Sequence, residues 1–145
     1  MTSARALIGL PVLLDGKPMG RAVGIGLDGG LRKLEGVYAD CGLKGVRLIR
    51  AIRLLGAVSV QAADAGKRAK LKGIPVRRVV TEDGARYGAV TGYLIEPRTL
   101  RIEALEVSRG FFEDFLEGRE WLFRYAVRDP QGDVLRMDGE GGEGQ

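Results

Sequence analysis

The stretch of residues 73–107 constrains the fold most, because it combines short apolar runs with strong turn signals. Its sequence is GIPVRRVVTEDGARYGAVTGYLIEPRTLRIEALEV. Tight turns are indicated at Asp83-Gly84 and at residues 96–99, and Gly88 and Gly92 lie inside the strand-like pattern, where glycine lets a sheet bend sharply. The stretch therefore predicts short strands in a small, strongly curled sheet.

The first half of the chain repeats this pattern at a nearly constant spacing. Residues 9–12 (GLPV) match residues 73–76 (GIPV) at an offset of 64, and the later matches lie at an offset of 68. The later matches pair Asp15-Gly16 with Asp83-Gly84, Gly20 with Gly88, Gly24 with Gly92, Asp28 with Glu96, Leu34-Glu35 with Ile102-Glu103, and Gly42 with Gly110. The change of offset predicts four extra residues in the second copy, between Val76 and Asp83. Two copies of one unit are therefore expected.

These patterns predict a mostly β protein with two small, strongly bent β-barrels in tandem and one or two short helices. We expect the first repeat at residues 1–64, a basic linker at 65–72, the second repeat at 73–137, and a disordered acidic, glycine-rich tail at 138–145. A unit of about 60–70 residues has only a marginal core of its own. The two units are therefore expected to pack on each other or on a second chain.

The two copies are expected to differ after their fourth strands. In the first copy the pattern predicts a helical turn near residues 50–54 and a closing strand over 57–62. In the second copy, apolar residues at helical spacing predict a short helix over 111–117 that stops at Gly118. The alternation of aromatic residues over 121–125 then predicts a strand.

The composition excludes several classes of site. The chain has 145 residues, of which 45% are hydrophobic and 29% charged, as in an ordinary soluble globular protein. It has no histidine, which excludes catalytic triads and zinc sites that depend on imidazole. Cys41 is the single cysteine, so no intramolecular disulfide can form, and we expect a reducing compartment, the cytoplasm. No apolar run is long enough to span a membrane as a helix.

Two sequence patterns imitate familiar signals. Residues 5–14 resemble a short signal peptide, but their match to the second copy predicts that they form the first strand of a folded unit. Residues 24–29 (GIGLDG) satisfy the glycine pattern of a dinucleotide-binding loop. That site needs a helix opening at the last glycine, whereas the residues that follow alternate in short steps. We therefore predict a glycine-rich hairpin turn and no cofactor.

A few polar residues could support catalysis or metal binding. Glu113 and Glu117 are four residues apart on the expected helix and could bridge a divalent cation, although an exposed acidic face is the commoner outcome. Cys41 and Ser108 have no histidine to activate them. The sequence therefore predicts no catalytic residue and no metal site.

Aromatic residues are concentrated in one part of the chain. Six of the nine lie within residues 111–125, more than one small barrel needs for its core. We expect part of this group to join the two copies and the exposed remainder to dock a protein partner. The candidate protein-docking residues are Phe111, Phe112, Phe115 and Trp121.

Basic residues are densest between the two copies, in a chain whose net charge is +4. Such a cluster could contact the phosphates of a nucleic acid, which needs no fixed spacing. A solvated linker is the simpler interpretation, because no aromatic residues for base stacking are interleaved with the cluster. The candidate nucleic-acid contacts are Lys67, Arg68, Lys70, Lys72, Arg77 and Arg78.

The second copy resembles the PRC-barrel family, named from the H chain of the photosynthetic reaction centre and also found in a ribosome maturation factor. The resemblance is carried by residues 80–84 (VTEDG), 88–90 (GAV), the acidic turn at 96–99 (EPRT) and residues 102–108 (IEALEVS). Residues 110–119 (GFFEDFLEGR) resemble the corresponding segment of bacterial proteins built from two such barrels. The resemblance covers residues 7–137 and is weaker in the first copy.

The resemblance implies an assembly or interaction module and offers no catalytic residues to transfer. Family members often carry an acidic residue where this chain has Thr91-Gly92, so a ligand role for that hairpin is not supported. We therefore expect a non-catalytic intracellular adaptor with a protein partner, and a homodimer is a further option. The alternative is an RNA-associated or ribosome-associated factor that uses the basic cluster.

Overall fold

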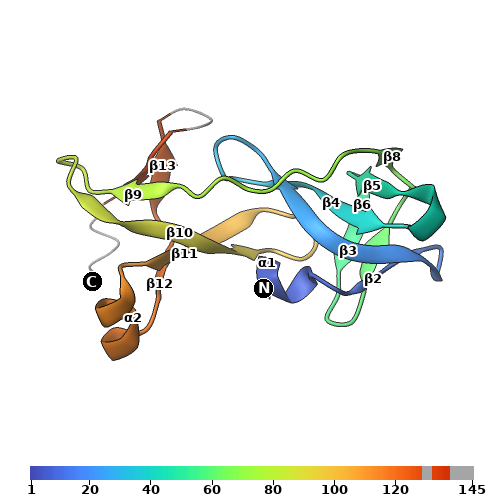
Figure 1. The fold of residues 1–145 in the computed structure, drawn as a ribbon, viewed down its shortest axis with the longest axis horizontal. Coiled ribbons are helices and arrows are strands. Elements are labelled where there is room, and N and C mark those ends of the chain that lie inside the picture. Colours follow the sequence, from blue (N-terminus) through green and yellow to red (C-terminus); the bar gives the residue numbers. More distant parts are fainter. Residues whose placement is uncertain (129–131, 138–145) are drawn as a thin grey trace.

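The chain is built from two curled β-sheets that lie side by side (Figure 1). The structure is a computed structural model that describes residues 1–128 and 132–137. Helices are few and short, namely α1 (Ala4–Leu7), the 3-10 turn η1 (Gly42–Lys44) and α2 (Phe111–Glu117). The expectation of a mostly β protein with strongly bent sheets and short helices is confirmed.

The first sheet contains the strands of the first half of the chain. Its order in space is β6-β7-β2-β3-β4-β5-β8. The bounds are β2 (Pro11–Leu14), β3 (Lys17–Leu27), β4 (Leu34–Asp40), β5 (Val46–Ile49), β6 (Ile52–Leu55), β7 (Val60–Ala62) and β8 (Lys67–Arg68). The long strand β3 lies at the centre and bends across the sheet.

The second sheet has the order β12-β11-β10-β9-β14-β13, and the short strand β1 (Thr2–Ser3) adds to β10. The bounds are β9 (Arg78–Val80), β10 (Arg86–Ile95), β11 (Ile102–Ser108), β12 (Glu120–Leu122), β13 (Tyr125–Val127) and β14 (Val134–Arg136). As expected, α2 stands between β11 and β12 and ends before Gly118, whose φ of 78° suits glycine.

The two sheets share one topology. Each sheet contains one parallel pair, β2 with β7 and β9 with β14, and its other strand pairs are antiparallel. The central hairpins also share their irregularities, since the register shifts at Ala22/Gly24 and Gly26/Leu27 recur at Val90/Gly92 and Leu94/Ile95. The structure thus shows the same offset of 68 that the sequence indicated.

The pairing of the first strand in each half shows that the alignment of residues 9–12 with residues 73–76 is wrong. Pro11 lies opposite Arg21 and Arg78 lies opposite Ala89, so the strands correspond at an offset of 67. The second hairpin is therefore longer by one residue and not by four. Residues 73–76 precede β9 as an extended segment without strand pairing, so their likeness to residues 9–12 was misleading.

The helical turn expected near residues 50–54 is wrong, because β6 occupies residues 52–55. Its apolar residues pair with β7, Leu55 opposite Val60 and Ile52 opposite Ala62. Leu55 is buried. Pairing with a neighbouring strand therefore overrides the local pattern, as is common for short apolar segments. The closing strand is confirmed at β7, although it begins at Val60 and not at residue 57.

The tips of the two central hairpins meet each other. Lys33 and Arg101, which correspond at the offset of 68, form an isolated antiparallel bridge. Two reciprocal hydrogen bonds flank it, from the Leu34 N–H to the Leu100 carbonyl (2.8 Å) and from the Ile102 N–H to the Arg32 carbonyl (2.9 Å). Because equivalent residues exchange equivalent bonds, the halves are related by an approximate two-fold axis through this bridge.

A shared core joins the halves around this axis. Leu31 and Leu100 are 2% and 7% exposed and belong to one continuous cluster of buried residues from both sheets. Tyr125 reaches across from β13, and its hydroxyl donates to the Leu31 carbonyl at 2.6 Å. Arg32 donates to the Tyr125 carbonyl at 2.6 Å, and its guanidinium lies 4.4 Å from the centroid of the Tyr125 ring. The two sheets therefore pack on each other.

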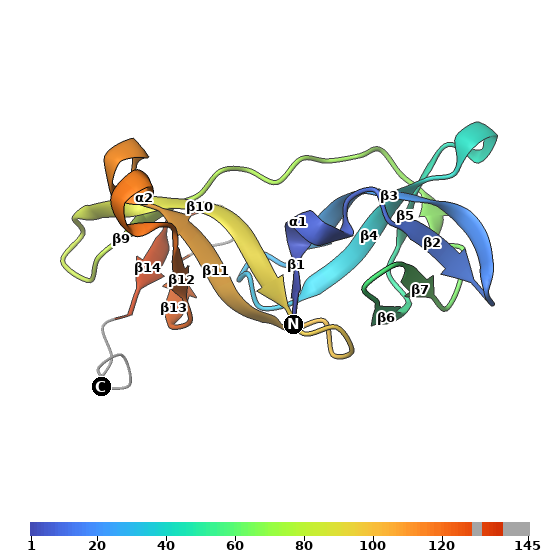
Figure 2. The ribbon, with the colours of Figure 1, turned by 90° about the horizontal axis from the view of Figure 1, so that it is seen from below.

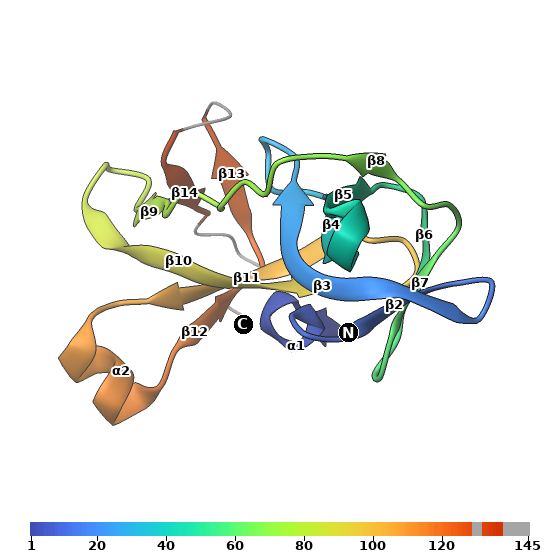
Figure 3. The ribbon, with the colours of Figure 1, turned by 45° about the vertical axis from the view of Figure 1, so that its right-hand side comes forward.

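Each half begins with a segment that lies against the other half. Thr2 and Ser3 pair with Ile95 and Leu94 of β10, and α1 packs beside them near the middle of the molecule (Figures 2 and 3). The chain from β8 to β9 crosses in the opposite direction over the first sheet (Figure 1). Leu71 of this crossing packs so closely on Gly24 that an added Cβ would lie 2.7 Å from its Cδ1 atom.

Candidate functional site

The helix α2 is an addition to the second half. In the first half, the corresponding loop between β4 and β5 has five residues, 41–45, and its only helical part is the 3-10 turn η1. The start of α2 is held by Asp114, whose carboxylate accepts hydrogen bonds from the Ser108 hydroxyl (2.5 Å) and the Arg109 N–H (3.2 Å). The Ser108 hydrogen bond is the main reason that the pKa of Asp114 is lowered. The carboxylate thus stays charged and keeps α2 in place.

Large apolar side chains are exposed on α2 and just after it. Phe115 is 77% and Leu116 76% exposed, and Trp121 of β12 and Phe123 are 39% and 60% exposed. We call these four residues the α2 surface. The backbones of the two other docking candidates, Phe111 and Phe112, begin α2, but their side chains lie outside the described residues.

The remaining aromatic residue of this region turns inward. Tyr125 is 3% exposed and contacts the first half, as described above. The alternation expected over residues 121–125 is interrupted, since β12 ends at Leu122 and β13 begins at Tyr125. Phe123 lies at this break and is left exposed.

Charged side chains fasten the N-terminal segment and α2 to the second sheet. Glu106 of β11 has a largely buried side chain and accepts a hydrogen bond from Arg5 at 3.0 Å and one from the Thr91 hydroxyl at 3.0 Å. Arg119 approaches both Glu106 (3.5 Å) and Asp114 (3.6 Å). These charges therefore have structural roles.

The six basic candidates do not form one surface. Lys67 and Arg68 form β8, which pairs with Leu48 and Arg47 of β5. Lys67, Arg68, Lys70 and Lys72 are exposed, and so is Arg78, whose side chain is 58% exposed.

Arg77 and Arg78 contact the second half. Arg77 is 8% exposed, and its Nη1 atom lies 3.5 Å from the Gly132 carbonyl oxygen. Arg78 forms an ion pair with Asp133 at 2.9 Å, which lowers the pKa of that carboxyl. Only the four residues from β8 to the crossing are thus well placed for contact with phosphates.

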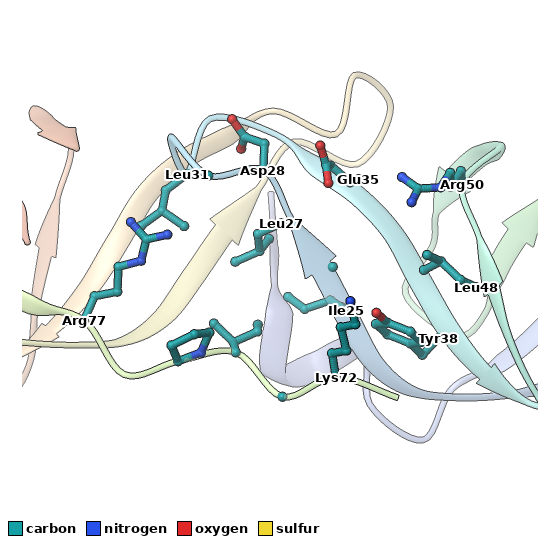
Figure 4. A pocket seen from close by; sticks show the side chains of 15 residues that line it. Ile25, Leu27, Asp28, Leu31, Glu35, Tyr38, Leu48, Arg50, Lys72 and Arg77 are labelled. Carbon is teal, nitrogen blue, oxygen red and sulfur yellow. The ribbon is translucent and has the colours of Figure 1, made fainter. Parts of the chain in front are cut away.

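A pocket of about 470 Å³ lies between the first sheet and the crossing chain, and we call it the crossover pocket (Figure 4). Ile25, Leu27 and Tyr38 of β3 and β4 form its apolar floor, and residues 72–75 form the opposite wall. Charged side chains stand around it, namely Asp28, Glu35, Arg50, Lys72 and Arg77. The pocket was not expected from the sequence, because its walls come from segments about 45 residues apart.

The glycine pattern at residues 24–29 borders this pocket. It runs along β3 into the hairpin turn, and β4 follows, so the expected hairpin is confirmed. Asp28 closes the turn by accepting hydrogen bonds from the Arg32 N–H (2.6 Å) and the Lys33 N–H (2.8 Å). Its carboxylate is therefore committed to the backbone.

The polar candidates for chemistry lie apart from one another. The Cys41 thiol is in the first half, 3.7 Å from the Ala39 carbonyl oxygen, whereas Ser108 is in the second half beside Asp114. Glu113 and Glu117 are exposed on α2. The structure therefore assembles no group from these four residues.

Comparison with known proteins identifies one family. The model of the PRC-barrel domain matches residues 74–143. A search of curated proteins found no match. Within residues 1–128 and 132–137, no helix has the length and apolar character needed to cross a membrane.

Proposed function

We propose, on the premise that residues 74–143 form a PRC-barrel domain, that the chain is a non-catalytic interaction module that docks a protein partner through the α2 surface. The observation that carries the proposal is the exposure of Phe115 and Leu116, each more than 75% accessible, on a helix that the first half lacks. Aromatic and large apolar side chains dominate the energies of protein interfaces.

The chemistry of the partner follows from the residues around this surface. Glu113 and Glu117 are exposed on the same helix as Phe115 and Leu116. Acidic residues at the rim of an apolar patch favour a partner with complementary charge and increase its rate of association. We therefore expect an apolar partner surface bordered by lysine or arginine.

The family match covers the second half, and we extend the same fold to the first half. Its strand order, its parallel closing pair and its register shifts correspond to those of the second half. The protein would then be a tandem of two PRC-type units, with the boundaries expected from the sequence. A cytoplasmic location completes the proposal and is supported by the single cysteine.

The test is a comparison of captured proteins between two double variants and the wild type. Phe115→Ala with Leu116→Ala removes the centre of the α2 surface, and both side chains are exposed, so the fold should persist with an unchanged melting temperature. The matched control is Leu43→Ala with Val58→Ala, because these apolar residues of the first half are 104% and 76% exposed.

Tagged proteins are incubated in nuclease-treated lysate, and the retained proteins are identified by mass spectrometry. A defined set that is retained by the wild type and the control, but lost from the α2 variant, supports the proposal. Retention of the same set by all three proteins contradicts it.

A second candidate function rests on the four exposed cations from Lys67 to Lys72. A run of lysine and arginine along one segment can bind phosphates through release of counterions. Binding to a fluorescent single-stranded RNA should then weaken steeply between about 50 and 200 mM salt. The partner would be RNA or the ribosome, and capture from lysate would disappear after nuclease treatment. RNA binding that does not respond to Lys67→Ala with Lys70→Ala excludes this function.

A further inference from the structure

Tyr38 is a largely buried tyrosine whose ring forms part of the floor of the crossover pocket. Its side chain is 6% exposed. Its hydroxyl points into the pocket (Figure 4) and makes no hydrogen bond within residues 1–128 and 132–137. The hydroxyl of a buried tyrosine usually has a hydrogen-bond partner. This hydroxyl therefore identifies a point at which the pocket can hold a polar group of a ligand.

Positive charge surrounds the same end of the pocket. Lys72 reaches in from the crossing chain beside the Tyr38 hydroxyl, and Arg50 stands above it, facing Glu35 (Figure 4). Lys72 takes part in none of the ion pairs that the described residues form. The carboxylate of Asp28 is bonded to backbone N–H groups at the other end of the pocket. Two cations and one free acid thus border this end, and an anionic group is favoured there.

The second half fills the equivalent place with an ion pair. Tyr38 of β4 and Glu106 of β11 correspond at the offset of 68. Lys72 and Arg5 also correspond, because each lies six residues before the first strand of its own half, β9 or β2. Arg5 donates to the Glu106 carboxylate at 3.0 Å. The first half therefore keeps the cation but has a phenol where the second half has a carboxylate.

We propose that the crossover pocket binds a small organic carboxylate with an apolar body. The carboxylate of the ligand takes the place that Glu106 has in the second half and accepts hydrogen bonds from the Tyr38 hydroxyl and from Lys72. The apolar body lies along Ile25 and Leu27, which continue the floor away from Lys72 (Figure 4). This site is separate from the α2 surface and does not depend on the function proposed for it.

The walls of the pocket favour a small molecule over a segment of a protein. The face of β3 and β4 closes the space on one side, and residues 72–75 of the crossing chain close it on the other. The volume of about 470 Å³ lies within the range of small-molecule sites. A compact ligand can therefore be covered on both sides.

The probes are octanoate, which has an alkyl body, and phenylpropionate, which has an aryl body. In calorimetry on the full-length protein, we expect at least one of them to bind at a single site. Its affinity should exceed at least tenfold that of the corresponding alcohol, which lacks the charge, and that of acetate, which lacks the apolar body. The tighter of the two acids then identifies the kind of body that the floor accepts.

Three substitutions test the groups that hold the carboxylate. Lys72→Met removes an exposed cation and should lower the affinity at least tenfold. Tyr38→Phe should lower it roughly tenfold, as expected for loss of a hydrogen bond to a charged group. Tyr38→Glu supplies a carboxylate from the chain itself, as Glu106 does in the second half, and should abolish binding. The control Lys67→Ala with Lys70→Ala removes two exposed cations outside the pocket and should leave the affinity unchanged.

The location of the bound probe is tested by NMR. We expect saturable shifts of the backbone amides of Tyr38 and of residues 72–74, and no shift of those of Phe115 and Leu116. Binding of neither acid, equal affinity for acid and alcohol, unchanged affinity in Lys72→Met, or an equal loss in the control variant would each overturn the proposal. Shifts confined to the α2 surface would overturn it as well.

Discussion

The hydroxyl group of Tyr125 forms a hydrogen bond between the two halves, and removing this group tests how much the contact contributes to stability. It donates to the Leu31 carbonyl at 2.6 Å, and both residues are at most 3% exposed. The substitution Tyr125→Phe deletes this donor and keeps the ring beside Arg32. The hydrogen bond from Arg32 to the Tyr125 carbonyl is unaffected, because it involves the backbone.

The size of the effect follows from the burial of the carbonyl that loses its donor. A buried polar group left without its partner costs about 1–3 kcal/mol of stability. For a chain of 145 residues this corresponds to a decrease in melting temperature of roughly 3–5 °C per kcal/mol. We expect the free energy of unfolding to fall by about 2 kcal/mol.

Urea unfolding monitored by circular dichroism measures this change. The control is Tyr93→Phe, because Tyr93 is similarly buried at 7% exposure and its hydroxyl makes no hydrogen bond among those that the structure describes. Its loss should be smaller than about 0.5 kcal/mol. Equal stability of Tyr125→Phe and the wild type would show that the hydroxyl does not join the halves.

Two further perturbations test the second sheet and its central turn. In Gly88→Ala the added methyl group would overlap the Ser108 carbonyl oxygen, so β10 and β11 must separate. Calorimetry should show that the free energy of unfolding falls by about 1–3 kcal/mol. The control Gly73→Ala has open space around the new methyl group and should change stability by less than about 0.5 kcal/mol. Hydrogen bonds from the Thr99 and Arg98 N–H groups lower the pKa of Glu96. The ionised Glu96 carboxylate therefore stabilises the fold above the ordinary glutamate pKa of about 4.3, and this stabilisation is lost as the pH falls through the lower pKa of the folded state. Carbon-detected NMR titration should therefore place the Glu96 midpoint below 4.3, and Glu96→Gln should flatten the loss of stability in acid; a midpoint at or above 4.3 contradicts this reasoning.

The features that could be predicted from the sequence depend on local geometry. Asp15-Gly16 and Asp83-Gly84 predicted hairpin turns because few residues other than glycine adopt the positive φ found at Gly16 and Gly84, 79° and 90°. The short helix before Gly118 was predicted for a similar reason. Turn and cap residues act within a few positions, so a single sequence contains their signal.

The features that could not be predicted depend on segments that meet only in the folded chain. The strand β6 has no strong pattern of its own and forms through its pairing with β7. The burial of Arg77 follows from the position of Gly132, 55 residues later in the chain. The crossover pocket likewise needs both β3 and the crossing chain. Its glycines at residues 26 and 29 were visible in the sequence, but the identity of the opposite wall was not.

The exchange of leading segments limits when one strand pairing can form during synthesis. Thr2 and Ser3 are synthesised first, yet their partners Ile95 and Leu94 follow 93 and 91 positions later. At about 5–20 residues per second, the nascent first half waits roughly 5–20 s for β10. During this time the strands β2 to β7 can pair among themselves, while α1 has no surface to cover. The pairing of Thr2 and Ser3 with β10 therefore cannot form until about 90 further residues have been made.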